Sequence, residues 1–307
     1  MIEKKSFEVP SSDGMHTLRG VVFLPDSEAK GVFQVVHGMT EHIGRYERFM
    51  KDMAEAGWIC FGHDNLGHGY TADNDSELGY IAKDRGWELL AKDVKAFSDA
   101  VISEFSQNGK PYCLMGHSMG SFIARIAAER YVKSTKLIVM GTGGSNPAAN
   151  IALVLISLIK LFKGEKHFSP LLDKLAFGGY NKRFDSSESD PSPWLTTDIE
   201  VRERYYADKF CTFKFTISAM GDLIRLVKYS NRSEWHKALS SDVHVLLVSG
   251  AEDPVGNYSK GVREVNDKLK RAGKNVDMHI YSGARHEILN DFTYEIVRSD
   301  ILDFVQR

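Results

Sequence analysis

Short runs of apolar residues alternate with amphipathic segments along most of the chain. Residues 5–9 and 17–24 alternate apolar and polar positions on either side of a Ser-Ser-Asp-Gly turn, which predicts an antiparallel hairpin. Later apolar runs are typical of buried strands: residues 31–36, 58–62, 112–115, 136–140, 243–249 and 276–281. Other segments have apolar residues at helical spacing: residues 46–56, 87–105, 119–132, 259–271 and 292–305. This alternation favours a mostly parallel sheet with helices on both faces.

The alternation stops at the glycine-rich segment 141–147. From residue 145 to residue 235 the chain shows helical patterns and turns, without a clear strand pattern. A length of 307 residues accommodates one large α/β domain with an insertion. We therefore expect an α/β core built from residues 1–144 and 236–307, interrupted by a mostly helical cap at residues 145–235.

Charge and composition exclude several classes of protein. Lysine and arginine number 39 against 41 aspartate and glutamate, a net charge of −2, so a nucleic-acid or polybasic membrane partner is not expected. With 43% hydrophobic and 26% charged residues, the chain is neither disordered nor collagen-like.

Cysteine usage and the N-terminal sequence bear on the compartment. Cys60, Cys113 and Cys211 are odd in number and lack CxxC spacing, so neither a disulfide framework nor a structural zinc site is expected. The first 14 residues lack the apolar core of a signal peptide, and the apolar stretch 151–162 is too short to span a bilayer. We expect a reducing, cytoplasmic location.

The sharpest local signal is Gly116-His117-Ser118-Met119-Gly120, which fits G-x-S-x-G. It follows the apolar run YCLM and opens a helical pattern, and a nucleophile elbow needs this placement between strand and helix. The glycines permit a sharp turn that presents the Ser118 hydroxyl at the sheet edge. The pattern therefore predicts that Ser118 is a nucleophile; the alternative is a chance pentapeptide at an ordinary turn.

A serine nucleophile needs a base and an acid that orients the base. In this arrangement the acid and then the histidine follow late strands, in the order Ser, Asp or Glu, His. Asp253 follows the run VHVLLVSG, and His286 follows VDMHIYSG. Glu252 competes for the role of acid, but Pro254 fixes the turn directly after Asp253, which favours Asp253. The order predicts a Ser118, Asp253, His286 triad, although each of the last two alone would be read as a turn or loop residue.

An oxyanion hole needs two preorganised N–H donors. One is expected from Met119, the residue after the nucleophile, and the other from the loop after an early strand. That loop is His37-Gly38-Met39-Thr40-Glu41-His42, where Gly38 permits the tight turn. We predict Met39 N–H as the second donor; the alternative is that this turn only ends a strand.

Together these segments resemble the monoacylglycerol lipase and lysophospholipase-like branch of the α/β-hydrolase superfamily. The resemblance is carried by HGMTEHIGRY (37–46), HDNLGHG (63–69), GHSMG (116–120), SGAEDPVG (249–256) and YSGARHE (281–287). It implies an eight-stranded sheet with an inserted helical cap and ester hydrolysis through an acyl-enzyme, without metal or cofactor. Two positions depart from the family pattern: Met39 stands where a small residue is common, and Asn65 where arginine is common.

Four histidine or aspartate side chains outside the triad could suggest other chemistry. His63, Asp64 and His68 have metal-ligand character, but hydrogen bonding within a turn is the favoured interpretation. His42 could tune the pH response of the site, and a structural histidine is the favoured alternative.

The insertion carries the substrate information. The stretch 151–162, IALVLISLIKLF, has only two polar residues, so its apolar arc on a helix is wider than a core-facing stripe. Part of that arc needs a second partner, which could be an acyl chain, a membrane surface met transiently or another subunit. The alternative is a helix buried on several sides within the cap. Leu155, Ile159 and Phe162 are the predicted substrate-binding residues.

The function favoured by these signals is a serine hydrolase of lipid-like carboxylic esters, with monoacylglycerol as the best single substrate. Lysophospholipids, short-chain esters and peptides cleaved by a proline-type aminopeptidase are the alternatives for the same machinery. A catalytically silent α/β-hydrolase fold that only binds a ligand is the alternative of another class.

Overall fold

The computed structural model describes residues 1–185, 187 and 190–307. Eight strands form one sheet: β1 (Glu3–Pro10), β2 (Thr17–Leu24), β3 (Gly31–Val36), β4 (Trp58–His63), β5 (Tyr112–His117), β6 (Lys136–Met140), β7 (His244–Gly250) and β8 (Val276–Tyr281). Their spatial order is β1-β2-β4-β3-β5-β6-β7-β8. The predicted hairpin forms between β1 and β2, and β2 also pairs antiparallel with β4, whereas all other neighbours are parallel. This is the α/β-hydrolase fold that the sequence predicts.

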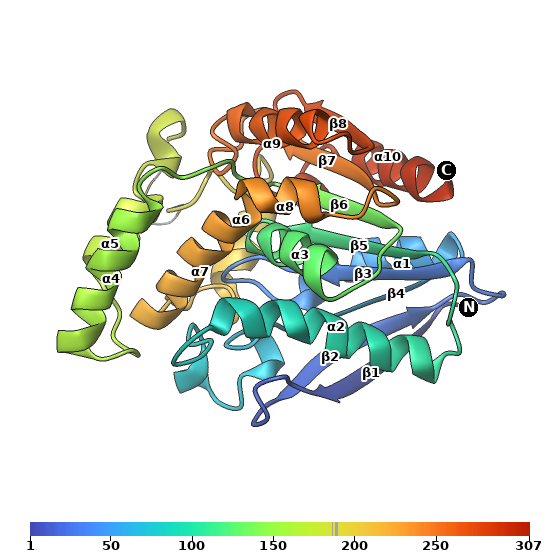
Figure 1. Cartoon of the computed structure of the whole chain (residues 1–307), viewed down its shortest axis with the longest axis horizontal. Helices are drawn as coiled ribbons and strands as arrows, with labels where there is room; N and C mark the ends of the chain where they lie inside the picture. Colours follow the sequence, from blue (N-terminus) through green and yellow to red (C-terminus); the bar gives the residue numbers. More distant parts are fainter. Residues whose placement is uncertain (186, 188–189) are drawn as a thin grey trace.

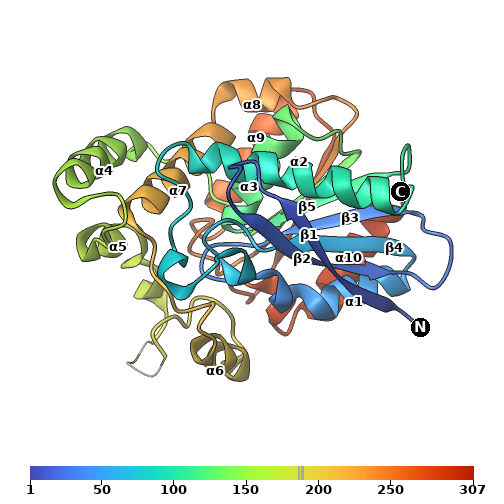
Figure 2. The ribbon, with the colours of Figure 1, turned by 90° about the horizontal axis from the view of Figure 1, so that it is seen from below.

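Two apolar cores lie on opposite faces of the sheet, because side chains alternate along each strand. On β6, Leu137 and Val139 join one core, and Ile138 and Met140 join the other. The first core is covered by α2 (Gly86–Glu104), α3 (Met119–Arg130) and α9 (Lys260–Arg271), and the second by α1 (Glu47–Glu55) and α10 (Tyr294–Gln306) (Figures 1 and 2). The parallel strands are buried on both faces, so the functional groups gather at their carboxyl ends.

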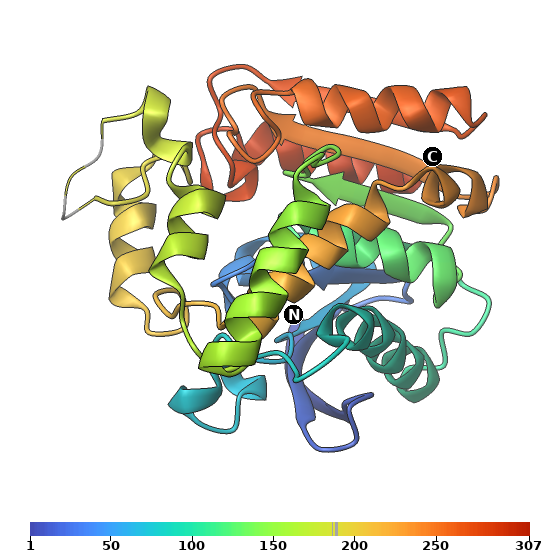
Figure 3. The same ribbon diagram turned by 60° about the vertical axis from the view of Figure 1, so that its left-hand side comes forward.

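The chain between β6 and β7 carries the remaining helices: α4 (Ala149–Lys163), α5 (Pro170–Phe177), α6 (Ile199–Ala207), α7 (Ile217–Ser230) and α8 (Ser233–Ala238). Helix α7 packs against α2 and α3, and α4 lies across the outer side of α7 (Figure 3). Ile156 of α4 is buried against this contact, close to Gly221. Helices α5, α6 and α7 each contribute residues to the cavity that also contains Ser118, whereas α8 packs on α3 and α9.

None of the helices in the described ranges combines the length and the apolarity that a membrane crossing requires. The three cysteines are free and buried.

Candidate active site

Ser118 occupies a strained turn between β5 and α3. Its backbone has φ 54° and ψ −121°, a region that costs a residue with a side chain about 1–3 kcal/mol. The two glycines of the motif make the turn possible by close approach: a Cβ on Gly116 would lie 2.1 Å from Gly120 O, and one on Gly120 would lie 2.1 Å from Val36 O. The Ser118 N–H donates to Met140 O at 3.0 Å, which ties the elbow to β6.

Asp253 and His286 form a buried pair beside the elbow. Asp253 Oδ2 lies 3.0 Å from His286 Nδ1, and neither residue is exposed by more than 2%. The ring N–H is not aligned for an ideal hydrogen bond, as is common for catalytic pairs before substrate binds. Val255 N–H donates to Asp253 Oδ1 at 2.8 Å, which holds the carboxylate in place. The pair can fix the histidine tautomer and stabilise a charged imidazole.

The loop after β3 reaches the nucleophile at Gly38. A Cβ on Gly38 would lie 2.9 Å from Ser118 Cβ, so only glycine permits this approach. Within the described part of the chain, Met39 N–H has no backbone acceptor. Met119 is the first residue of α3, where N–H groups have no acceptor within the helix. Both N–H groups stay available as donors beside Ser118.

A buried network supports this loop from behind. Glu41 Oε1 accepts from Gly38 N–H at 2.5 Å and from Tyr46 Oη at 2.9 Å, and it lies 3.2 Å from His117 Nδ1. Burial opposes the charged form of both Glu41 and His117, but their mutual hydrogen bond and charge outweigh it. The pKa of Glu41 is therefore lowered far below its usual value, and the pKa of His117 is raised above 6.5.

The same network touches the predicted base. His117 Nε2 lies 3.3 Å from His286 O, and the two rings are 4.7 Å apart between centroids. Arg45 links the loop after β3 to the histidine loop, because it binds Glu41 at 3.1 Å and Glu287 at 2.6 Å. His286 and the loop that carries Met39 are thus held in one connected, buried framework.

A cavity of about 760 Å³ opens in front of Ser118 and His286. Its walls come from the loop after β3, from α3 and from the helices between β6 and β7. Many of the wall residues are large and apolar: Phe122, Phe177, Trp194, Leu195, Phe213, Leu223 and Val227. The volume falls in the range of small-molecule sites.

Comparison with known proteins identifies this arrangement. The sequence model of the serine aminopeptidase S33 family matches residues 27–293. The chain belongs to this family. A monoacylglycerol lipase of Mycolicibacterium smegmatis is 26% identical over 97% of this chain and 98% of that protein. The human monoglyceride lipase is 33% identical over 34% of this chain and 33% of that protein.

A solved structure shows the same fold. A thermostable carboxyl esterase from Bacillus coagulans, determined in complex with glycerol, superposes with a TM-score of 0.92 at 26% identity, over 100% of this chain and 99% of that chain. The family and fold expected from the sequence motifs are therefore confirmed.

The three residues of α4 predicted to bind substrate do not line the cavity of this S33 family member. Leu155 and Ile159 are half-buried and pack against the core, and Phe162 is 79% exposed. Helix α4 lies on the outer side of α7, so Leu223 and Val227 of α7 line the cavity in its place. The three residues therefore lie outside the cavity wall of this structure, and their part in substrate binding stays a prediction.

The other histidine and aspartate positions make local contacts. Asp64 accepts from Ile43 N–H and Tyr70 N–H, each at 2.8 Å, and the ring of His68 bonds Leu66 O, as expected for turn residues. His63 instead stacks on Phe97 with ring centroids 4.7 Å apart, and burial lowers its pKa to about 3.

Asn65 supports the turn where the family pattern has arginine. Its N–H donates to His37 Nε2 at 2.9 Å and its amide to His37 O at 3.3 Å. The side chain therefore holds the first residue of the loop that carries Met39.

Sequence reasoning assigned no role to five residues around the site: Glu41, Arg45, His117, Trp194 and Glu287. Glu41, Arg45, His117 and Glu287 lie inside the motifs that carry the family resemblance. Their place in those motifs was the signal that could have indicated a role for them. No sequence signal indicated Trp194, because it lies in the insertion outside the motifs. Its ring packs on His286 with centroids 5.1 Å apart, and its carbonyl accepts from His286 N–H.

Proposed function

We propose that the protein hydrolyses monoacylglycerols with long acyl chains through an acyl-enzyme on Ser118. The protein is a carboxylic ester hydrolase of the α/β-hydrolase fold. The observation that supports a long-chain substrate is the cavity of about 760 Å³ with largely aromatic and aliphatic walls in front of Ser118. Each buried methylene contributes about 0.8 kcal/mol, so such walls favour an extended acyl chain.

In the proposed acylation step, His286 removes the Ser118 hydroxyl proton as Oγ bonds to the ester carbonyl carbon. The carbonyl oxygen becomes an oxyanion, which Met39 N–H and Met119 N–H stabilise. Asp253 stabilises the imidazolium. His286 then donates its proton to the leaving glycerol oxygen as the ester C–O bond breaks.

In deacylation, His286 removes a proton from water as the water oxygen attacks the acyl carbon. The proton returns to Ser118 Oγ when the acyl bond to serine breaks, which releases the fatty acid and restores the enzyme. Each turnover consumes one ester and one water molecule and releases glycerol and a fatty acid.

The polar part of the cavity suits a glycerol head group. Asn146, Asn257, Lys260 and Glu264 border the cavity, and Glu264 accepts from Ser145 N–H at 3.3 Å. They offer both donors and acceptors for hydroxyl groups. The similar esterase was determined with glycerol bound.

We further propose that the cap takes its substrate from a lipid surface. One side of α4 exposes large apolar residues, and α5 adds two more: Ile151, Val154, Leu158, Leu161, Phe162, Leu171 and Leu175. Helix α5 also contributes Phe177 to the cavity wall, so the exposed face continues toward the site. Lys163 and Lys166 flank this face, which suits anionic head groups.

A hydrolysis panel tests the proposed substrate. We expect kcat/KM for a long-chain monoacylglycerol to exceed that for a lysophospholipid of equal chain length, for nitrophenyl acetate and for an aminoacyl-proline substrate. A preference for one of the other three would assign the cavity to a lysophospholipase, a short-chain esterase or an aminopeptidase. A protein that fails to react with a fluorophosphonate probe would be a silent binding protein.

A further inference from the structure

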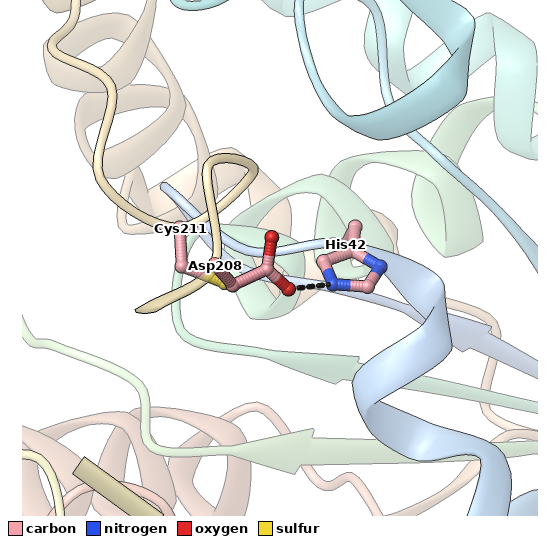
Figure 4. A group of neighbouring side chains, drawn as sticks. All are labelled: His42, Asp208 and Cys211. Carbon is pink, nitrogen blue, oxygen red and sulfur yellow. Dashed lines mark hydrogen bonds and ion pairs between the residues drawn. The ribbon is translucent and has the colours of Figure 1, made fainter. Parts of the chain in front are cut away.

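His42, Asp208 and Cys211 meet where the loop after β3 touches the segment that links α6 to α7 (Figure 4). His42 Nε2 lies 2.9 Å from Asp208 Oδ2. One donor atom from each of the three side chains lies within 4.8 Å of the other two. The cluster thus combines an imidazole, a carboxylate and a thiol, and His42 lies 166 positions from Asp208 in the sequence.

This donor set is suited to zinc-class cations. Tetrahedral zinc takes Cys, His and carboxylate ligands at about 2.0–2.3 Å, which places donor atoms about 3.3–3.8 Å apart. His42 and Asp208 are slightly closer than this, and no pair that includes Cys211 Sγ exceeds 4.8 Å. Small side-chain rotations would therefore bring all three onto one ion, with a fourth position left for water.

The charges around the cluster also favour a cation. Arg45 faces it, but this guanidinium is already paired with Glu41 and Glu287. Together with Asp208, three carboxylates surround one guanidinium, so negative charge predominates even when His117 is protonated.

The cluster can be reached from solvent and from the cavity. The side chains of His42 and Asp208 are 16% and 33% exposed, and Cys211 borders the cavity. Burial raises the pKa of the Cys211 thiol, and a bound metal displaces that proton.

We propose that His42, Asp208 and Cys211 form a site for a soft divalent cation of the zinc class. The ion joins the α6–α7 segment to the loop that carries Met39. The end of α6, directly before this segment, already contacts the same loop, because the Tyr205 hydroxyl donates to Thr40 O at 2.9 Å. An occupied site therefore fixes the cavity wall formed by Thr40 and Cys211. The proposal does not depend on the proposed substrate, because binding is measured without turnover.

The test uses Co²⁺ as a spectroscopic probe of the full chain. We expect one equivalent to bind, with thiolate-to-cobalt absorption in the near ultraviolet and a rise in melting temperature, and Zn²⁺ to displace it. Since loss of a supporting outer-shell group costs about 10–100-fold in metal affinity, loss of a ligand in Cys211→Ser or His42→Gln should cost at least about 100-fold. The Cys211→Ser variant should also lack the thiolate band.

A matched control comes from the second group of metal-type donors, His16, Asp73 and Glu77, which contains no thiol. The His16→Gln variant should keep the thiolate band and the affinity. Absence of the band at millimolar Co²⁺, or an unchanged band in Cys211→Ser, would overturn the proposal.

A second measurement decides the matter if Cys211→Ser does not fold. In the wild-type protein, Zn²⁺ should protect Cys211 from alkylation, as read by peptide mass. Cys60 and Cys113, which are fully buried in the core, serve as internal references. Equal labelling of Cys211 with and without Zn²⁺ would refute the site.

Discussion

At the scale of single residues, Asp253 and Glu252 are neighbours with different contacts. Asp253 Oδ2 lies 3.0 Å from His286 Nδ1, whereas Glu252 N–H donates to Ala284 O. Loss of the orienting carboxylate leaves histidine in the wrong tautomer, so we expect Asp253→Asn to lower kcat roughly 10⁴-fold. Glu252→Gln should change kcat little. Steady-state kinetics of both variants test the assignment, and the reverse ranking would move the acid to Glu252.

The oxyanion donors give a second prediction at this scale. Backbone N–H groups, not side chains, are assigned to Met39 and Met119, so Met39→Ala and Met119→Ala should each keep most of kcat. Loss of a true oxyanion donor costs about 10²–10³-fold. A drop of that size in either variant, with an unchanged melting temperature, would show that the side chain is needed and the assignment is wrong.

The Glu41–His117 pair makes stability depend on pH. Its contribution through His117 is complete below pH 6.5 and is lost as pH rises through the raised pKa of this residue. Its contribution through Glu41 is present above pH 4.5 and is lost only as pH falls through the lowered pKa. We expect the free energy of unfolding to fall above pH 6.5 in the wild-type protein, and less in Glu41→Gln. Denaturant unfolding of both proteins across this pH range tests the prediction. Parallel plots of the free energy of unfolding against pH for the two proteins would contradict it.

At the scale of elements, α4 has two faces with different roles. Replacing Ile151, Val154 and Leu158 with serine should weaken binding to anionic vesicles and leave the melting temperature and nitrophenyl acetate hydrolysis unchanged, because these residues are exposed. The matched control is Leu155→Ser with Ile159→Ser, which removes half-buried side chains. Each of these should cost about 1–3 kcal/mol of stability. If the triple serine variant binds vesicles as well as the wild-type protein does, the lipid-surface proposal is wrong.

The elements show how far the sequence could predict the fold. The strand at residues 136–140 consists of one lysine and then four apolar residues, and the composition and length of this short run indicate a buried strand directly. The apolar arc of α4 was visible too, but an arc does not say which neighbour it meets. The packing of α7 between α4 and the cavity is a tertiary contact between distant segments, and no local pattern encodes it.

In the site, too, local sequence patterns predict some residues, and only the tertiary structure shows the others. Ser118, Asp253 and His286 could be predicted to lie together because each follows a strand, and parallel strands bring their carboxyl ends to one edge. The framework of Arg45 with Glu41 and Glu287 joins residues up to 242 positions apart. Charged residues of this kind look like surface groups in a sequence, and only the fold shows that they are buried together.

At the scale of the whole molecule, the sheet, the framework and the cap have separate tasks. The sheet edge positions Ser118, Asp253 and His286, the proposed nucleophile, acid and base, and the buried network holds the loop that carries Met39. The helices between β6 and β7 supply part of the cavity wall, together with α3 and the loop after β3, so under the proposed function they help to determine which ester fits. Changes in the cap should therefore alter substrate preference more than the chemical step.

The central claim is that Ser118 cleaves esters whose acyl chain fills the apolar cavity. The most direct measurement is kcat/KM for monoacylglycerols of graded chain length, kept below their aggregation limits, with wild-type protein and Ser118→Ala. We predict a rise of up to roughly fourfold per methylene until the cavity is filled, as expected from about 0.8 kcal/mol each. Ser118→Ala should lower every value by roughly 10⁴-fold or more. A profile that is flat with chain length, or a Ser118→Ala variant that retains near-normal activity, would contradict the account.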